Sequence, residues 1–182
     1  MNELELIRAQ LAAERRHAGA VADAGAAVFA TQPTGAAALE GFRQACVDYL
    51  VCVLAWFEER DRRLAHLASR PADQAVRAAL DDALARPGGS RETLEKLEAA
   101  LAAGTGTAWR EFVQYFHGVW SARREALDAL LSANARIADW RALAGVDADT
   151  ILEERARYAR VRAAAPEGVR LAAETGEVPR GG

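Results

Sequence analysis

Lysine, cysteine and proline are all scarce in this chain of 182 residues. Lys96 is the only lysine among 23 basic residues, and the remainder are arginines. These arginines alternate with acids, as in residues 58–63, and the net charge is −3. Because no stripe of one sign forms, the sequence lacks the basic footprint of a protein that binds nucleic acid.

Long apolar runs are missing too. The longest run, Tyr49 to Phe57, is about half as long as a membrane span. The first 17 residues show no basic stretch followed by an apolar core, so we expect no signal peptide. The sequence therefore predicts a cytoplasmic protein that neither spans nor binds a membrane.

Motifs of enzyme chemistry are also lacking. Cys46 and Cys52 are six residues apart on one predicted helix, which directs them to different faces and predicts buried free thiols. We find no glycine-rich phosphate loop, no zinc-type Cys/His spacing, and no Ser or Cys in a loop with a nearby His and an orienting carboxylate. No residue is therefore a catalytic candidate, and the pattern favours a protein that is not an enzyme.

What the chain has in abundance is Ala, Leu, Arg and Glu, all strong helix formers. Turn signals divide the chain, at Thr31–Gly35, before Pro71, at Pro87–Gly89, at Gly104–Thr107 and at Pro166. They predict helices over about 2–29, 36–69, 72–103 (interrupted at Pro87 and restarting at Ser90), 108–136 and 147–164. The predicted fold is all-α: one domain over 1–166, with an antiparallel four-helix bundle at 2–136, an additional C-terminal helix at 147–164, and a flexible tail at 167–182.

Three long helices carry mostly apolar residues at alternating steps of three and four, the spacing of bundle seams. The predicted seams are Leu4, Ile7, Leu11, Glu14, Ala18, Val21, Gly25 and Val28 in the first helix, Cys46, Leu50, Val53, Phe57, Arg60, Leu64 and Leu67 in the second, and Trp109, Val113, Phe116, Trp120, Arg123, Leu127, Leu130, Asn134 and Ile137 in the fourth. One charged residue interrupts each of three seams: Glu14, Arg60 and Arg123. The long arginine stems can reach the bundle edge, where the charge meets water. Glu14 is shorter and lies mid-helix, so it needs a partner in the core.

Two histidines fall at matching heights. If the chain reverses near residues 33, 71 and 105, then His17 and His117 lie at one level, with Asp48 and Tyr49 nearby. Glu14 lies one turn before His17 on nearly the same face. Two explanations stay open: a metal site formed by Glu14, His17, Asp48 and His117, or a polar layer in which the histidines hydrogen-bond to Glu14, Asp48 or Tyr49.

The chain resembles the bacterial hemerythrin-like helical bundles over residues 2–136. The resemblance rests on Glu14-Arg-Arg-His17, on the aromatic-rich stretch from Asp48 to Glu59, and on His117 within Tyr115–Trp120. It implies a core di-iron centre held by histidines and carboxylates, for which His17 and His117 are the matching ligands. The family's other ligand motifs have no counterpart here, which favours a degenerate or metal-free member of that architecture.

Two functions follow as expectations. The first is a bundle that holds a metal, iron by the resemblance, for sensing or handling oxygen or metal. The second is a metal-free, non-enzymatic interaction protein, with a homodimer or another protein as its partner. A stripe on the fifth predicted helix could pack on the bundle or on such a partner: Ile151, Leu152, Arg155, Tyr158 and Val161.

Overall fold

The computed structural model describes residues 3–31, 37–68, 90–133 and 148–171, and over these ranges it is helical, with no strands. The five described helices are α1 (Glu3–Thr31), α2 (Ala37–Ala68), α4 (Ser90–Ala103), α5 (Gly106–Ala133) and α7 (Ala148–Ala164). The all-α prediction is confirmed, and these bounds agree with the predicted ones to within three residues. The predicted helical stretch before Pro87, the segment between the predicted helices 108–136 and 147–164, and most of the C-terminal tail lie outside the described ranges.

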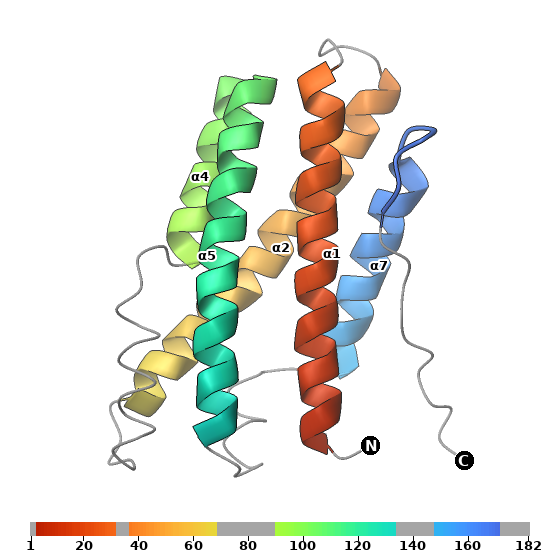
Figure 1. Ribbon diagram of the computed structural model, residues 1–182. Helices are drawn as coiled ribbons and strands as arrows, with labels where there is room; N and C mark the ends of the chain where they lie inside the picture. The colour runs from red at the N-terminus through yellow and green to blue at the C-terminus, as the bar shows by residue number, and fades with distance from the viewer. Residues whose placement is uncertain (1–2, 32–36, 69–89, 134–147, 172–182) are drawn as a thin grey trace, which may run out of the picture.

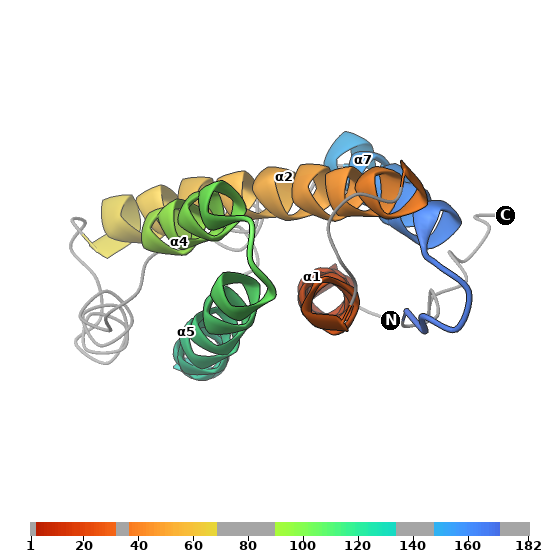
Figure 2. The same cartoon turned by 90° about the horizontal axis from the view of Figure 1, so that it is seen from above.

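The helices pack as a bundle in which α1, α4 and α7 run one way and α2 and α5 the other (Figure 1). Contacts join α1 to α2, α2 to α4, α4 to α5 and α5 to α1, which closes a ring of four helices. Helix α7 lies outside this ring, against α2 and α1. Seen from above, α2 extends along the whole molecule and crosses α1 obliquely, so the packing is less regular than four parallel rods (Figure 2). No described helix is both long and apolar enough to cross a bilayer.

The turn between α4 and α5 shows how the sequence ends one helix and starts the next. Gly104 has a φ of 64° and its N–H donates to the carbonyl of Ala100 at 3.1 Å, a left-handed cap that glycine adopts without strain. The hydroxyl of Thr105 then accepts from the N–H of Ala108 at 3.2 Å, which satisfies one free donor at the start of α5. The predicted turn at Gly104–Thr107 therefore corresponds to a pair of helix caps.

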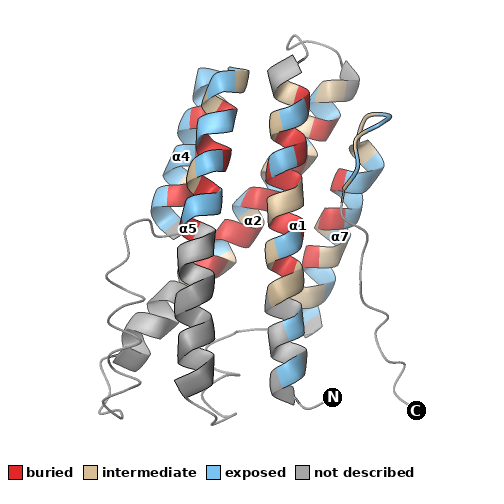
Figure 3. Cartoon of the chain, in the orientation of Figure 1, coloured by how far each residue is buried: buried red, intermediate tan, exposed pale blue. Residues whose placement is uncertain are grey.

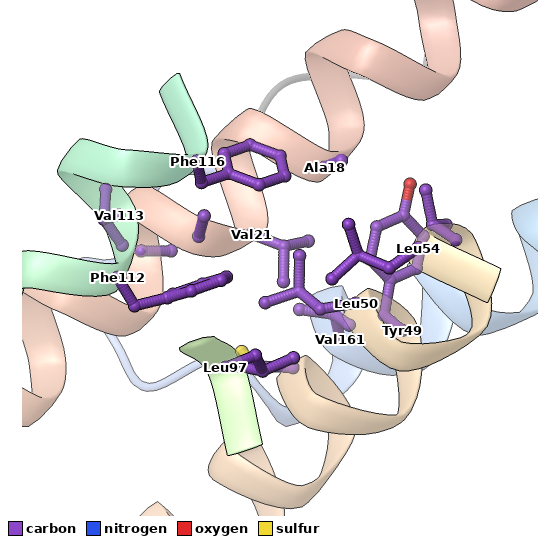
Figure 4. Packing of buried hydrophobic residues seen from close by; sticks show 14 of the residues in the cluster. Ala18, Val21, Tyr49, Leu50, Leu54, Leu97, Phe112, Val113, Phe116 and Val161 are labelled. Atoms are coloured by element: carbon purple, nitrogen blue, oxygen red, sulfur yellow. The ribbon is translucent and has the colours of Figure 1, made fainter. Parts of the chain in front are cut away.

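The predicted seams line the core, where the buried faces of α1, α2 and α5 turn inward (Figure 3). The seam residues whose side chains are described are all buried: Glu14, Ala18, Val21, Gly25, Val28, Cys46, Leu50, Val53, Phe57, Trp109, Val113 and Phe116. The side chains of Arg60 and Arg123 lie outside the described part of the chain, so their positions stay predictions. Figure 4 shows Phe112, Val113 and Phe116 on one side of this core and Tyr49 with Leu54 on the other.

One close approach fixes the distance between α1 and α5. The indole of Trp109 lies against the backbone of α1, and its Nε1–H donates to the carbonyl of Ala22 at 3.1 Å. A Cβ at Gly25 would lie 2.7 Å from Cζ2 of Trp109, nearer than packed carbon atoms approach each other. Only glycine at this position lets the ring rest on the helix.

We predict that Gly25→Ala lowers the free energy of unfolding by about 1–3 kcal/mol, the usual range for overpacking a core. The rigid, hydrogen-bonded indole cannot move aside, so the clash outweighs the gain of up to about 1 kcal/mol that alanine brings to a helix interior. Urea unfolding measures the change. The matched control is Gly118→Ala in α5, where a Cβ meets nothing within 4 Å and should stabilise. Equal effects of the two substitutions would contradict the packing described.

Candidate functional site

A cluster of buried polar side chains joins α1, α2 and α7, and we call Glu14, His17, Tyr49, Glu154 and Tyr158 the polar cluster. Glu14 and His17 come from α1, Tyr49 from α2, and Glu154 and Tyr158 from α7. Each is 5% exposed or less. Charged and polar groups are rarely buried this deeply unless other groups satisfy them, so the cluster is the most informative feature of the core.

The carboxylate of Glu154 is the centre of this cluster. Its Oε1 lies 2.6 Å from the hydroxyl of Tyr49 and 2.8 Å from Nδ1 of His17. An ionised carboxylate only accepts hydrogen bonds, so with Glu154 ionised both Tyr49 and His17 donate to this one oxygen. Hydrogen bonds to a charged acceptor are roughly twice as strong as those between neutral groups. One side chain of α7 is thereby bonded to two helices of the bundle.

Aromatic stacking supports the same arrangement. The ring of Tyr158 lies parallel to the imidazole of His17, with centroids 4.0 Å apart and 10° between the planes. Tyr158 also packs at a tilt on Tyr49, at 5.7 Å between centroids. Because Glu154 and Tyr158 are one helical turn apart, both reach the gap between α1 and α2 from the same face of α7.

The environment keeps the Tyr49 phenol protonated. Burial raises the pKa of Tyr49 well above 10, and the charge of Glu154 and the hydrogen bond to it raise it further. The charge of Glu14 adds to the rise, so this second buried carboxylate also acts on the phenol. The cluster therefore holds Tyr49 as a hydrogen-bond donor, not as a phenolate base or nucleophile.

The sequence predicted the height of His117 along the bundle correctly, but it wrongly predicted that the side chain points into the core. A Cβ on Gly19 would lie 3.5 Å from Cε1 of His117, so the ring lies about half a turn along α1 from His17. Its side chain is nevertheless 47% exposed, and its Nε2 pairs with Oδ1 of Asp23 at 2.7 Å. The inward position on α5 belongs to Phe116, and one residue later the helix has turned by about 100°.

Asp48 is also outside the cluster, for the same reason. Tyr49 takes the inward position on α2, while Asp48 is exposed and accepts from Nε2 of Gln44 at 2.7 Å. Of the four proposed metal ligands, the structure thus brings together Glu14 and His17 and leaves Asp48 and His117 on the surface. Among the residues it describes, no group of three or more His, Cys, Asp or Glu side chains is arranged to hold a metal ion.

The sequence interpretation missed Glu154 altogether. Tyr158 and Val161 of the predicted stripe are buried, whereas Leu152 is 63% exposed and does not pack on the bundle, so that packing of Leu152 on a partner stays a prediction. The buried face of α7 is instead Glu154, Tyr158 and Val161, at the i, i+4 and i+7 positions of one helix face. The available signal was the same one that singled out Glu14: a carboxylate inside an otherwise apolar stripe.

The two cysteines add no reactive group. Burial raises the pKa of Cys46 to about 12 and that of Cys52 to about 11. Both are free, and neither forms an appreciable amount of thiolate near neutral pH. The prediction of buried free thiols is confirmed for Cys46, whereas Cys52 is free but only partly buried, beside Glu153.

Comparison with known proteins adds no relative: no family model matches the chain, and neither the curated proteins nor the solved structures contain a match. The resemblance to hemerythrin-like bundles accordingly stays a prediction.

We predict that the free energy of unfolding falls as the pH rises above about 10. The unfolded Tyr49 phenol ionises near pH 10, while the raised folded pKa keeps its proton on. The unfolded state then binds fewer protons than the folded state, and stability falls by up to about 1.4 kcal/mol per pH unit. Cys46 adds a loss that begins near pH 9, because its pKa is raised in the same direction.

Urea unfolding between pH 7 and 11 measures this dependence. Tyr49→Phe should be less stable at pH 7, where the hydrogen bond to Glu154 is lost, but should show a shallower decline above pH 10. Cys46→Ala is the matched control, since it removes only the part of the decline that starts near pH 9. A decline in Tyr49→Phe as steep as in the parent would refute the assignment.

Proposed function

We propose that this chain is a non-enzymatic, metal-free helical interaction protein, in which the polar cluster serves to attach α7 to the bundle. The observation that carries the proposal is the closed pairing of Tyr49 and His17 with Glu154, three side chains that are each 5% exposed or less. A catalytic acid or base must come within hydrogen-bond reach of a substrate. Groups that are sealed from solvent and bonded to one another are better suited to holding helices in place.

The competing proposal is a hemerythrin-like metal protein. One observation favours it: Glu14 and His17, the Glu-x-x-His pair, are both buried on the same face of α1. The remaining donors do not fit, since Asp48 and His117 are both exposed. A centre of this family needs several convergent ligands with open positions, so we favour the interaction protein.

We predict that His17→Leu lowers the free energy of unfolding by about 1–3 kcal/mol, because it leaves the buried Glu154 without one of its donors. The matched control is His117→Leu, which breaks an exposed pair with Asp23 and should cost less than about 1 kcal/mol. Urea unfolding gives both values.

Elemental analysis of the untagged protein, carried out beside these measurements, separates the two proposals. An interaction protein should contain no stoichiometric iron, manganese or zinc, in the parent or in either variant. Stoichiometric metal in the parent that disappears in His17→Leu would reject the proposal and restore the metal-binding one.

A further inference from the structure

Helix α7 exposes one large apolar side chain, Leu152. Among the described residues only Leu152 and Val51 are large, apolar and exposed, and Leu152 is the more exposed of the two, at 63% against 38%. Leu152 lies two residues before the buried Glu154, about 200° round the helix, and therefore on the face turned away from the bundle. Ala156, one turn later, is exposed on the same face, so the leucine stands out beside a small side chain.

Two charges of opposite sign flank this leucine, and we call Asp149, Leu152 and Arg155 the knob. Asp149 lies three residues before Leu152 and Arg155 three residues after it, which places them about 60° round the helix on either side. Asp149 is exposed and Arg155 is partly exposed. Neither forms an ion pair with another described residue, whereas Arg157 on the same helix pairs with Glu153. The knob therefore presents an apolar side chain between an acid and a base that the described part of the chain does not neutralise.

A hollow lies open between α4 and α5. Its volume is about 440 Å³, and it is lined by four alanines, the rings of Phe112 and Tyr115, and two charged side chains. A mostly apolar lining with a few polar groups is typical of sites that bind another molecule. A cavity of roughly 150 Å³ already holds a benzene ring, so the hollow is large enough to receive a leucine side chain.

The two charges of the hollow come from its two opposite walls. Lys96 belongs to α4 and Glu111 to α5. The ammonium of Lys96 lies 4.9 Å from the centroid of the Tyr115 ring, and neither Lys96 nor Glu111 forms an ion pair with another described residue. The hollow thus presents a base and an acid on either side of an apolar lining, which complements the acid and the base on either side of Leu152.

The knob and the hollow of one chain do not meet. Helix α7 contacts α2 and α1 but neither α4 nor α5, and α4 packs beside one half of α2 while α7 packs beside the other half (Figure 1, Figure 2). We propose that the knob of one copy inserts into the hollow of a second copy, with Asp149 beside Lys96 and Arg155 beside Glu111. This inference rests on the proposed interaction function and names its partner. Charges of opposite sign on both sides of the leucine orient the contact and disfavour other surfaces.

The contact joins two different surfaces, so a pair of molecules still has one free knob and one free hollow. Head-to-tail contacts of this kind build rings when the rotation between copies closes and open chains when it does not. The contact is also weak, because it buries one leucine and two exposed ion pairs. Association should therefore increase with protein concentration and decrease with added salt.

Sedimentation velocity over a concentration series of the full-length chain tests the contact. The parent should form dimers and larger species as its concentration rises. Leu152→Glu should weaken association about tenfold or more, because it removes the one large apolar side chain of the knob. Val51→Glu is the matched control: Val51 is the other exposed large apolar residue, lies on α2 outside the contact, and its variant should associate like the parent.

Mixing two blocked variants tests whether the two surfaces bind each other. Ala99→Arg fills the hollow and leaves the knob intact, and Ala102→Arg is its control, exposed on α4 but outside the hollow. Leu152→Glu and Ala99→Arg alone should each associate far more weakly than the parent. Their mixture should form a 1:1 dimer and nothing larger, because the intact hollow of the first receives the intact knob of the second. All these positions are exposed, so thermal melts of the variants should match that of the parent.

Exchanging charges tests the flanking pairs. Glu111→Arg alone and Arg155→Glu alone should each weaken association about two- to fivefold, the effect of losing one exposed ion pair. Both substitutions in one chain restore a base opposite an acid, so the double variant should associate like the parent.

A parent that stays monomeric at every concentration would overturn the inference. So would a Leu152→Glu variant that associates like the parent, or a mixture of the two blocked variants that forms no dimer. In those last two cases an associating parent would bind its copies through another surface, and the proposed interaction function would stand without this contact. The metal analysis above remains the separate test of that function.

Discussion

The buried carboxylate of Glu154 is the interaction on which the arrangement of α1, α2 and α7 depends. An ionised carboxylate in a protein core is costly unless donors satisfy it. Tyr49 and His17 supply two such donors to one oxygen, at 2.6 and 2.8 Å. Glu154 is 105 residues from Tyr49 and 137 residues from His17 in the sequence, so a single acceptor on α7 determines how a distant helix meets α1 and α2. Removing either donor leaves the Glu154 carboxylate with one hydrogen bond fewer.

Apolar packing stabilises the ring of four helices, whereas the polar cluster fixes α7 on that ring. The ring formed by α1, α2, α4 and α5 is closed by aromatic and aliphatic side chains, with Trp109 resting on α1 at Gly25. Among the described side chains of α7, only Tyr158 and Val161 are both buried and apolar, so its attachment to the bundle depends correspondingly more on hydrogen bonds. Directional bonds fix one alignment of α7, whereas apolar burial alone is insensitive to direction.

Much of this architecture follows from periodicity in the sequence. The seams through Ala18, Leu50 and Val113 predicted which faces are buried, since helical spacing decides the face of each residue. The matching of heights across the turns also located His17, Tyr49 and His117 at about one level. The height of a residue along the bundle follows from the lengths of the helices, and the turn signals in the sequence mark where these long helices begin and end.

Periodicity does not say which neighbouring helix a given side chain faces, nor where a further helix packs. His117 is one residue from the inward-facing Phe116. That single residue rotates the imidazole away from the core and onto the surface, where it pairs with Asp23. Glu154 could not be assigned to the cluster either, because residues 134–147 separate α7 from the bundle and helical spacing does not say which groove a fifth helix enters.

A double-mutant cycle on Tyr49→Phe and Glu154→Gln tests most directly whether the carboxylate of Glu154 holds these helices together. Residues that share a buried hydrogen bond are coupled, so the two substitutions together should cost less than the sum of their separate costs, by about 1 kcal/mol or more in urea unfolding. Additive effects, with a coupling energy near zero, would show that the bond between Tyr49 and Glu154 does not hold α7 in place and would contradict this account.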